Sequence, residues 1–174
     1  MSTREAMSHA ALGWVKPELD QTLLQMRQEI EDYVDNPDQS QHMLQAANWL
    51  HQVQGTLHMV ELYAPAMVAE ELELLAKAIG AGQVADRNES CAILMRGTVL
   101  LPDYLERLQN GHRDIPIVLL PLLNEIRAAR GAEGLNEGVL LAVVFCFIIG
   151  VVFGLYPANK AAKMKPIDAL HYGG

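Results

Sequence analysis

A histidine and a glycine four residues apart give this sequence its clearest chemical possibility. His51 and Gly55 lie in the stretch NWLHQVQGTLHMVE, residues 48–61. In a helix, positions four apart are neighbours on one face. An exposed imidazole on such a face is a nucleophile that can accept a phosphoryl group. A glycine one turn away would leave room for a carboxylate of another protein to approach the ring.

The glycine needs a reason, because a glycine inside a helix costs about 1 kcal/mol relative to alanine. The apolar positions Leu50, Val53 and Leu57 recur at helical spacing. They define a buried face from which His51 and Gly55 are offset. We therefore predict that His51 is solvated, and that Gly55 serves close approach by a partner.

These residues resemble the signature of histidine phosphotransfer (HPt) domains, H-x-x-K-G-[S/T/A] on the second helix of a helical bundle. The matching positions are His51, Gly55 and Thr56, whereas Gln54 stands where the family usually has lysine. The resemblance implies that His51 is the phospho-acceptor. The family lysine would help to hold a group that brings about −1.5 to −2 charge, and Gln54 offers a hydrogen bond without charge.

Longer runs of the sequence resemble the N-terminal domain of ChpA-type hybrid histidine kinases, which belong to the chemosensory system of type IV pili and twitching motility. FimL-like scaffold proteins share this domain. The resemblance implies a phosphorelay module without a kinase catalytic domain, which binds or phosphorylates a response-regulator receiver domain, or binds a pilus scaffold protein. The alternative is an HPt fold used only for docking, as a scaffold. The runs are 13–19, 50–61, 69–73, 101–109 and 112–131.

The elements that must position His51 are helices. Leu, Ala, Met, Glu and Gln dominate, and β-branched residues are sparse before residue 115, which favours helix. We predict an all-α fold, an antiparallel bundle over 16–131 behind an N-terminal tail, 1–15. The expected helices run from Pro17 to the DNPDQS turn, from a cap at Ser40 or Asp38 through the HPt motif, from Pro65 to Gly80, over about 86–109, and from Ile115 or Pro116 to Arg130.

Other side chains are expected to be structural. We predict that Trp14 and Trp49 pack in the protein, that the run from Glu70 to Glu73 forms a solvated face, and that His58 decorates the surface. The dispersed histidines show no zinc spacing, and no Gly-rich phosphate loop occurs. The sequence therefore predicts neither a metal nor a cofactor.

The net charge of −8 is unevenly distributed. Residues 138–174 contain three lysines and one aspartate, so the first 137 residues carry −10. An acidic domain repels nucleic acid, and we exclude DNA and RNA as partners. The N-terminus lacks a signal-peptide pattern, so we expect the helical domain in the cytoplasm.

The composition changes after a Gly-rich linker, 132–137. Residues 138–156 are 19 residues without a charge, and a helix of this length spans roughly 28 Å, close to the hydrocarbon core of a bilayer. We predict a transmembrane helix, with Gly150 and Gly154 spaced for close helix packing. The alternative is a buried core helix. A basic amphipathic tail, 157–174, follows.

This C-terminal part resembles the last transmembrane helix of FtsX/MacB-type ABC transporter permeases. The resemblance offers a second candidate function, a fragment of such a permease. We expect the chain at the bacterial inner membrane, and we infer that two unrelated pieces meet near residues 134–138, by natural fusion, by engineering or by a gene artefact. The matching positions are Gly154, Pro157, Ala158, Ala161, Ala162, Pro166, Ala169 and Leu170.

Overall fold

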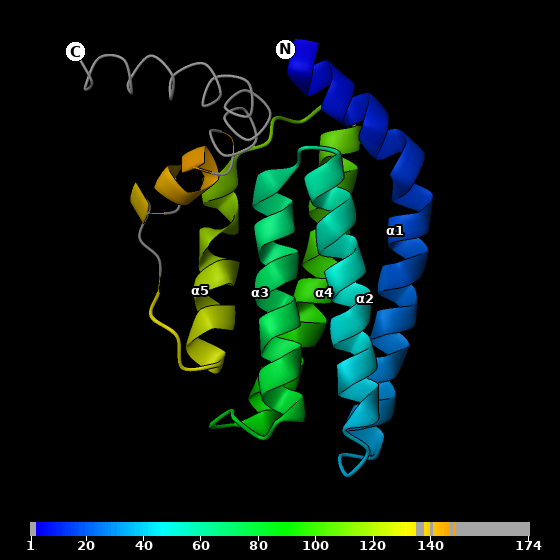
Figure 1. The fold of residues 1–174 in the computed structure, drawn as a ribbon, viewed down its shortest axis with the longest axis vertical. Helices are drawn as coiled ribbons and strands as arrows, with labels where there is room; N and C mark the ends of the chain where they lie inside the picture. Colours follow the sequence, from blue (N-terminus) through cyan, green and yellow to red (C-terminus); the bar gives the residue numbers. More distant parts are fainter. Residues whose placement is uncertain (1–2, 135–137, 140, 147, 149–174) are drawn as a thin grey trace, which may run out of the picture.

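Five α-helices form the bundle over residues 3–129 (Figure 1). This structure, a computed structural model, describes residues 3–134, 138–139, 141–146 and 148. The elements are α1 (Thr3–Asp35), α2 (Gln41–Met59), α3 (Tyr63–Gly80), α4 (Arg87–Gln109), the 3₁₀ turn η1 (Pro116–Leu119) and α5 (Leu120–Ala129). Within these ranges no strand occurs, which confirms the all-α prediction.

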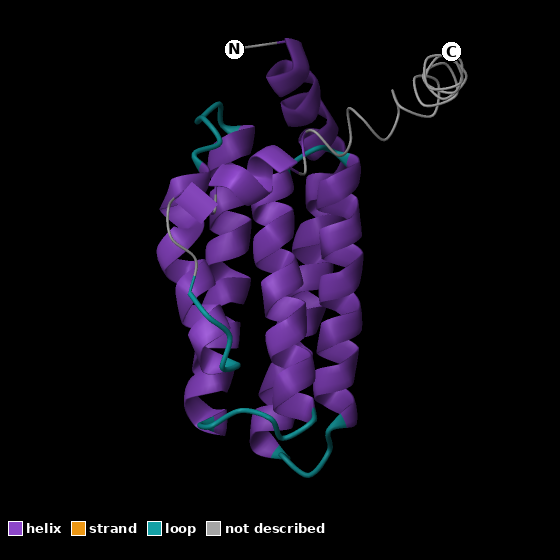
Figure 2. Cartoon of the chain, turned by 60° about the vertical axis from the view of Figure 1, so that its left-hand side comes forward, coloured by secondary structure: helices purple, strands orange, loops and turns teal. Residues whose placement is uncertain are grey.

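The helices lie side by side as an up-and-down bundle (Figure 2). Helix α2 packs between α1 and α3, α4 closes the bundle against α1 and α3, and α5 lies against α3 and α4. The short connections between consecutive helices make them antiparallel neighbours. The predicted apolar face of α2 is confirmed, since Leu50, Val53 and Leu57 are fully buried. Burial of this face turns the opposite side of α2 to solvent.

Helix α1 begins at Thr3, which corrects the predicted start at Pro17 and the predicted tail over 1–15. Leu12 is fully buried in the core, so tertiary packing supports helix before the proline. Pro17 lies inside the helix, where it removes a backbone hydrogen bond and its ring crowds the carbonyl of Gly13. The N-terminal third of α1 leans away from the direction of the rest (Figure 1).

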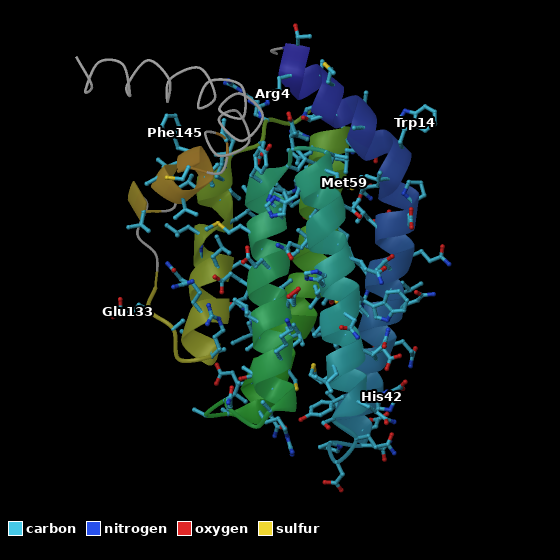
Figure 3. The ribbon with its side chains drawn as sticks, in the orientation of Figure 1. Arg4, Trp14, His42, Met59, Glu133 and Phe145 are labelled. Atoms are coloured by element: carbon cyan, nitrogen blue, oxygen red, sulfur yellow. The ribbon has the colours of Figure 1, made fainter. Side chains whose placement is uncertain are left out.

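Two further predictions were wrong. Trp14 does not pack, because 87% of it is exposed, and it points outward from α1 (Figure 3). Glu71 and Glu73 are not solvated, since only 6% and 5% of them are exposed. Glu71 is held by Arg127 at 2.7 Å and Arg130 at 2.9 Å, so an ionic clamp joins α3 to α5. Buried carboxylates require such partners.

A glycine lets α4 approach α3 closely. A Cβ built on Gly97 would lie 2.5 Å from Cδ2 of Leu72, which is fully buried. No side chain fits there without displacing a core residue. Gly97 is therefore a packing glycine, unlike Gly55.

Ten of the 19 residues of the predicted membrane span lie outside the described residues, and Gly150 and Gly154 are among them. Among the residues that the structure describes, no helix combines the length and the apolar character needed to cross a membrane. Residues 141–146 are helical, and Val143 and Val144 pack in part against the core of the bundle.

Candidate functional site

His51 stands on the outer face of α2, with 72% of its side chain exposed. Its Nδ1 lies 2.6 Å from Oε1 of Glu73 on the neighbouring helix α3. The Glu73 side chain is only 7% exposed. The site thus pairs an accessible ring with a carboxylate buried beneath it, held by two adjacent helices of the bundle.

The Glu73 contact fixes which ring nitrogen carries the proton. An ionised carboxylate can only accept hydrogen bonds, so Nδ1 of His51 must donate. In the neutral ring, Nε2 then keeps its lone pair. A fixed tautomer on a largely exposed ring gives a nucleophile oriented toward an external electrophile.

Lys77 completes the group around the buried carboxylate. Its Nζ lies 3.3 Å from Oε2 of Glu73, one helical turn away on α3, and its side chain is 55% exposed. Glu73 therefore receives His51 on one oxygen and Lys77 on the other. A hydrogen bond on one oxygen and an ion pair on the other offset the cost of burying this charge.

The other residues of the HPt-like motif are placed around this group. Gly55 is exposed, and a Cβ built there would meet no atom within 4 Å. Gln54 is half-buried, and the Thr56 hydroxyl donates 3.0 Å to the carbonyl of Gln52 within the helix. His51 and Gly55 thus share one exposed face, as the sequence predicts. The hydroxyl of Thr56 uses its proton in a hydrogen bond within α2.

Exposed apolar side chains flank His51 along α2. Leu44 is 52% exposed and Met59 80% exposed, and their spacing of seven and eight residues from His51 keeps them on its side of the helix. Met59 lies at the opposite end of α2 from His42 (Figure 3). We call Leu44, His51, Gly55 and Met59 the His51 face.

Sequence reasoning missed Glu73 and Lys77. The run from Glu70 to Glu73 was interpreted as a solvated face because it is acidic. The available signal was the spacing, since Lys77 follows Glu73 by four residues and forms a helical i,i+4 pair. The sequence does not show that Glu73 faces α2, because the packing of α3 against α2 is part of the tertiary structure.

One group of potential metal ligands lies elsewhere. Single ligand atoms of Glu29, Asp32 and His42, all half-buried, lie within 4.8 Å of one another where α1 meets α2. A divalent ion could use an imidazole nitrogen and two carboxylates. Both His42 nitrogens already have partners, however, Glu29 at 2.7 Å and Gln39 at 2.9 Å. This arrangement is explained by a hydrogen-bonded ion pair.

A cleft lies at the end of the bundle where α2 turns into α3. It has a volume of about 770 Å³ and is lined by Arg4, Glu61, Arg113 and Val144, among others. Arg4 pairs with Glu61 at 2.8 Å across it, and Glu61 has a φ of 62°, the left-handed conformation that often ends a helix. Neither His51 nor Glu73 lines this cleft.

Residues 10–111 match the Hpt domain family. The chain belongs to this family. Scaffold protein FimL of Pseudomonas aeruginosa is 32% identical over 127 residues, which are 73% of this chain and 23% of FimL. No solved structure matches the chain.

Short matches to permeases also exist. The uncharacterized ABC transporter permease YknZ of Bacillus subtilis is 63% identical over 30 residues, 17% of this chain and 8% of YknZ. The macrolide export ATP-binding/permease protein MacB of Chlorobium phaeobacteroides is 59% identical over 34 residues, 20% of this chain and 5% of MacB. The chain thus spans less than a quarter of each of these relatives.

Proposed function

We propose that this Hpt-family chain is a phosphorelay module in which His51 accepts a phosphoryl group and passes it to a receiver domain. The observation that carries the proposal is the contact between the exposed His51 ring and the buried carboxylate of Glu73 at 2.6 Å. It supplies an accessible nucleophile with one tautomer and one orientation. Hpt domains act as phosphotransfer or scaffold modules, so we do not propose a kinase activity for the chain.

In this reaction Nε2 of His51 attacks phosphorus of a receiver's aspartyl phosphate. The Nε2–P bond forms, the P–O bond breaks, and the receiver's aspartate leaves as a carboxylate. The proton on Nδ1 stays on the ring throughout and is donated in a hydrogen bond to Glu73. Positive charge that develops on the ring is offset by this fixed carboxylate. The reverse sequence of steps returns the group to a receiver.

The partner we propose is a response-regulator receiver domain that docks on the His51 face. Leu44 and Met59 are exposed apolar side chains on either side of the histidine, and a receiver docked on this face would cover them. The bare backbone at Gly55 permits close approach of the receiver's acidic site. Following the sequence resemblance, we place this exchange in a type IV pilus chemosensory system.

A second candidate is a scaffold that docks partners without phosphorylation. The similarity to Scaffold protein FimL favours it, and so does Gln54, which gives no charge at the position of the family's lysine. We also propose that residues 138–156 tether the helical domain to the bacterial inner membrane, with that domain in the cytoplasm; insertion would release Val143 and Val144 from their contact with the bundle core. The alternative for this segment, a permease fragment, rests on the short permease matches.

The deciding experiment is phosphotransfer to the full chain. The wild type and His51→Gln are incubated with a phosphorylated receiver of a pilus chemosensory system, and acid-labile label is measured. We expect label on the wild type and none on His51→Gln, with receiver binding measured in parallel. Receiver binding by both proteins with no label on either would establish the scaffold and reject the phosphorelay.

The tether is tested separately. Membrane fractions of cells that express the full chain should retain it after a high-salt wash. Release of the chain into the wash would argue against a spanning segment.

A further inference from the structure

We propose that Lys77 holds the phosphoryl group on His51, supplying from α3 the cation that Gln54 does not supply on α2. The inference rests on the proposed phosphorelay function and adds a residue to that site. It is carried by a chain of contacts, from His51 Nδ1 to Glu73 Oε1 at 2.6 Å and from Glu73 Oε2 to Lys77 Nζ at 3.3 Å. The ammonium and the imidazole therefore share one carboxylate.

The charges at the site favour an additional cation after phosphorylation. Glu73 already places a carboxylate against the ring. A phosphoryl group adds a charge of about −1.5 to −2 on the same imidazole. Two anions this close repel each other, and a neutral glutamine at position 54 cannot offset either. The cation must come from another position.

Lys77 is suited to this task by its place and its length. It lies on the helix that pairs with α2, and 55% of its side chain is exposed, so the ammonium is not fixed in the core. In the proposed exchange, its flexible four-carbon stem carries the ammonium from Glu73 to a phosphoryl oxygen. Phosphate oxygens form strong charge-assisted hydrogen bonds. No covalent bond forms or breaks in this exchange of partners.

A lysine beside a carboxylate has a simpler possible role, which is to keep Glu73 in place under His51. The two roles differ in what can replace the lysine. Glutamine can still donate a hydrogen bond to Glu73 but carries no charge. A lysine returned at position 54 of α2 brings a charge to His51 from one helical turn away.

The test uses the full chain and phosphoramidate, a small-molecule phosphoryl donor that requires no partner protein. Transfer breaks the P–N bond of the donor, forms the Nε2–P bond and releases ammonia. The measured quantity is the rate at which phosphohistidine is lost after the donor is removed, followed by phosphorus NMR. The variants are Lys77→Gln, Lys77→Arg, and Lys77→Gln combined with Gln54→Lys.

We expect Lys77→Gln to lose the phosphoryl group roughly fivefold faster than the wild type, a size appropriate to one half-exposed ionic contact. Lys77→Arg should stay near the wild type, and the added Gln54→Lys should restore the slow rate. Arg107→Gln is the matched control. Arg107 forms an exposed i,i+4 pair with Asp103, also at 3.3 Å, and its loss should leave the rate unchanged.

Each alternative result has a definite meaning. A wild type that takes up no phosphoryl group rejects the proposed function, and this inference with it. Equal rates for a labelled wild type and Lys77→Gln reject the role of Lys77 alone. Faster loss that Gln54→Lys does not rescue would make Lys77 a positioning residue for Glu73, and the proposal would be wrong. Circular dichroism confirms that each variant is folded.

Discussion

The substitution Gly55→Ala separates the stability of α2 from its use as a docking face. A Cβ at this position meets no atom within 4 Å, and Gly55 is not among the residues with positive φ. Nothing inside the described protein therefore requires glycine here. Alanine should stabilise the helix by about 1 kcal/mol, the difference in helix propensity. We expect the melting temperature to rise by about 3–5 °C.

Docking should change in the opposite direction. If a receiver approaches the backbone beside His51, the added methyl group forces the two surfaces apart. We expect affinity for the receiver to fall by roughly fivefold, as for a modest overpacking of a close interface. Thermal unfolding by circular dichroism gives the stability, and isothermal titration calorimetry gives the affinity. A variant that gains stability and binds the receiver as the wild type does would refute the close-approach argument.

Three further substitutions probe how the bundle supports the site. Gly97→Ala should destabilise the fold by about 1–3 kcal/mol in chemical denaturation, because the added Cβ would lie 2.5 Å from Leu72. Unchanged stability would mean that α4 can shift away from α3 without cost. Glu71→Ala leaves Arg127 of α5 and Arg130 at its C-terminal cap without their buried partner, so amide exchange in α5 should rise at least about tenfold relative to α2. The third substitution is Tyr104→Phe, and the Tyr104 hydroxyl donates a hydrogen bond to Asp114. Burial and the Asp114 carboxylate raise the pKa of Tyr104 well above its ordinary value. The stability that the protonated Tyr104 adds to the fold is therefore present below about pH 10. It is lost above that pH, where the tyrosine of the unfolded chain ionises. Urea titrations should show a steeper loss of stability above pH 10 in the wild type than in Tyr104→Phe.

The face of α2 could be predicted because it is a local property of the sequence. Leu50, Val53 and Leu57 recur with the helical period, and burial of one side of a helix determines which residues lie on the other. The exposure of His51 follows from this geometry alone. The bounds of α4 were predicted almost to the residue because turn residues flank it, and Asp86 accepts a capping hydrogen bond from the backbone of Glu89.

The start of α1 and the role of Glu73 could not be predicted, because both depend on tertiary contacts. Pro17 is favourable in the first turn of a helix, yet α1 begins at Thr3, because burial of Leu12 stabilises the helical turns before the proline. An acidic run is usually solvated, yet the packing of α3 against α2 turns Glu73 under His51. The sequence thus predicted the exposure of His51 but not the buried carboxylate that contacts its ring.

Glu73 also offers a way to distinguish phosphotransfer from docking by energetics. Burying a carboxylate is costly, and a buried ion pair can often be replaced by an apolar residue without loss of stability. A scaffold needs only the shape of the His51 face, so it has no use for this charge. The structure nevertheless keeps Glu73 with 7% of its side chain exposed, in contact with His51 and Lys77.

The substitution Glu73→Leu tests whether the function of the His51 face depends on the charge of Glu73. His51 and Lys77 are both more than half exposed, so water can solvate them once the carboxylate is gone. We expect the free energy of unfolding to change by less than about 1 kcal/mol and receiver binding to be retained. Label on His51 should fall at least about tenfold, because the tautomer and orientation of the ring are no longer fixed. Undiminished label would show that His51 reacts as an ordinary surface histidine and that its contact with Glu73 plays no part in phosphotransfer.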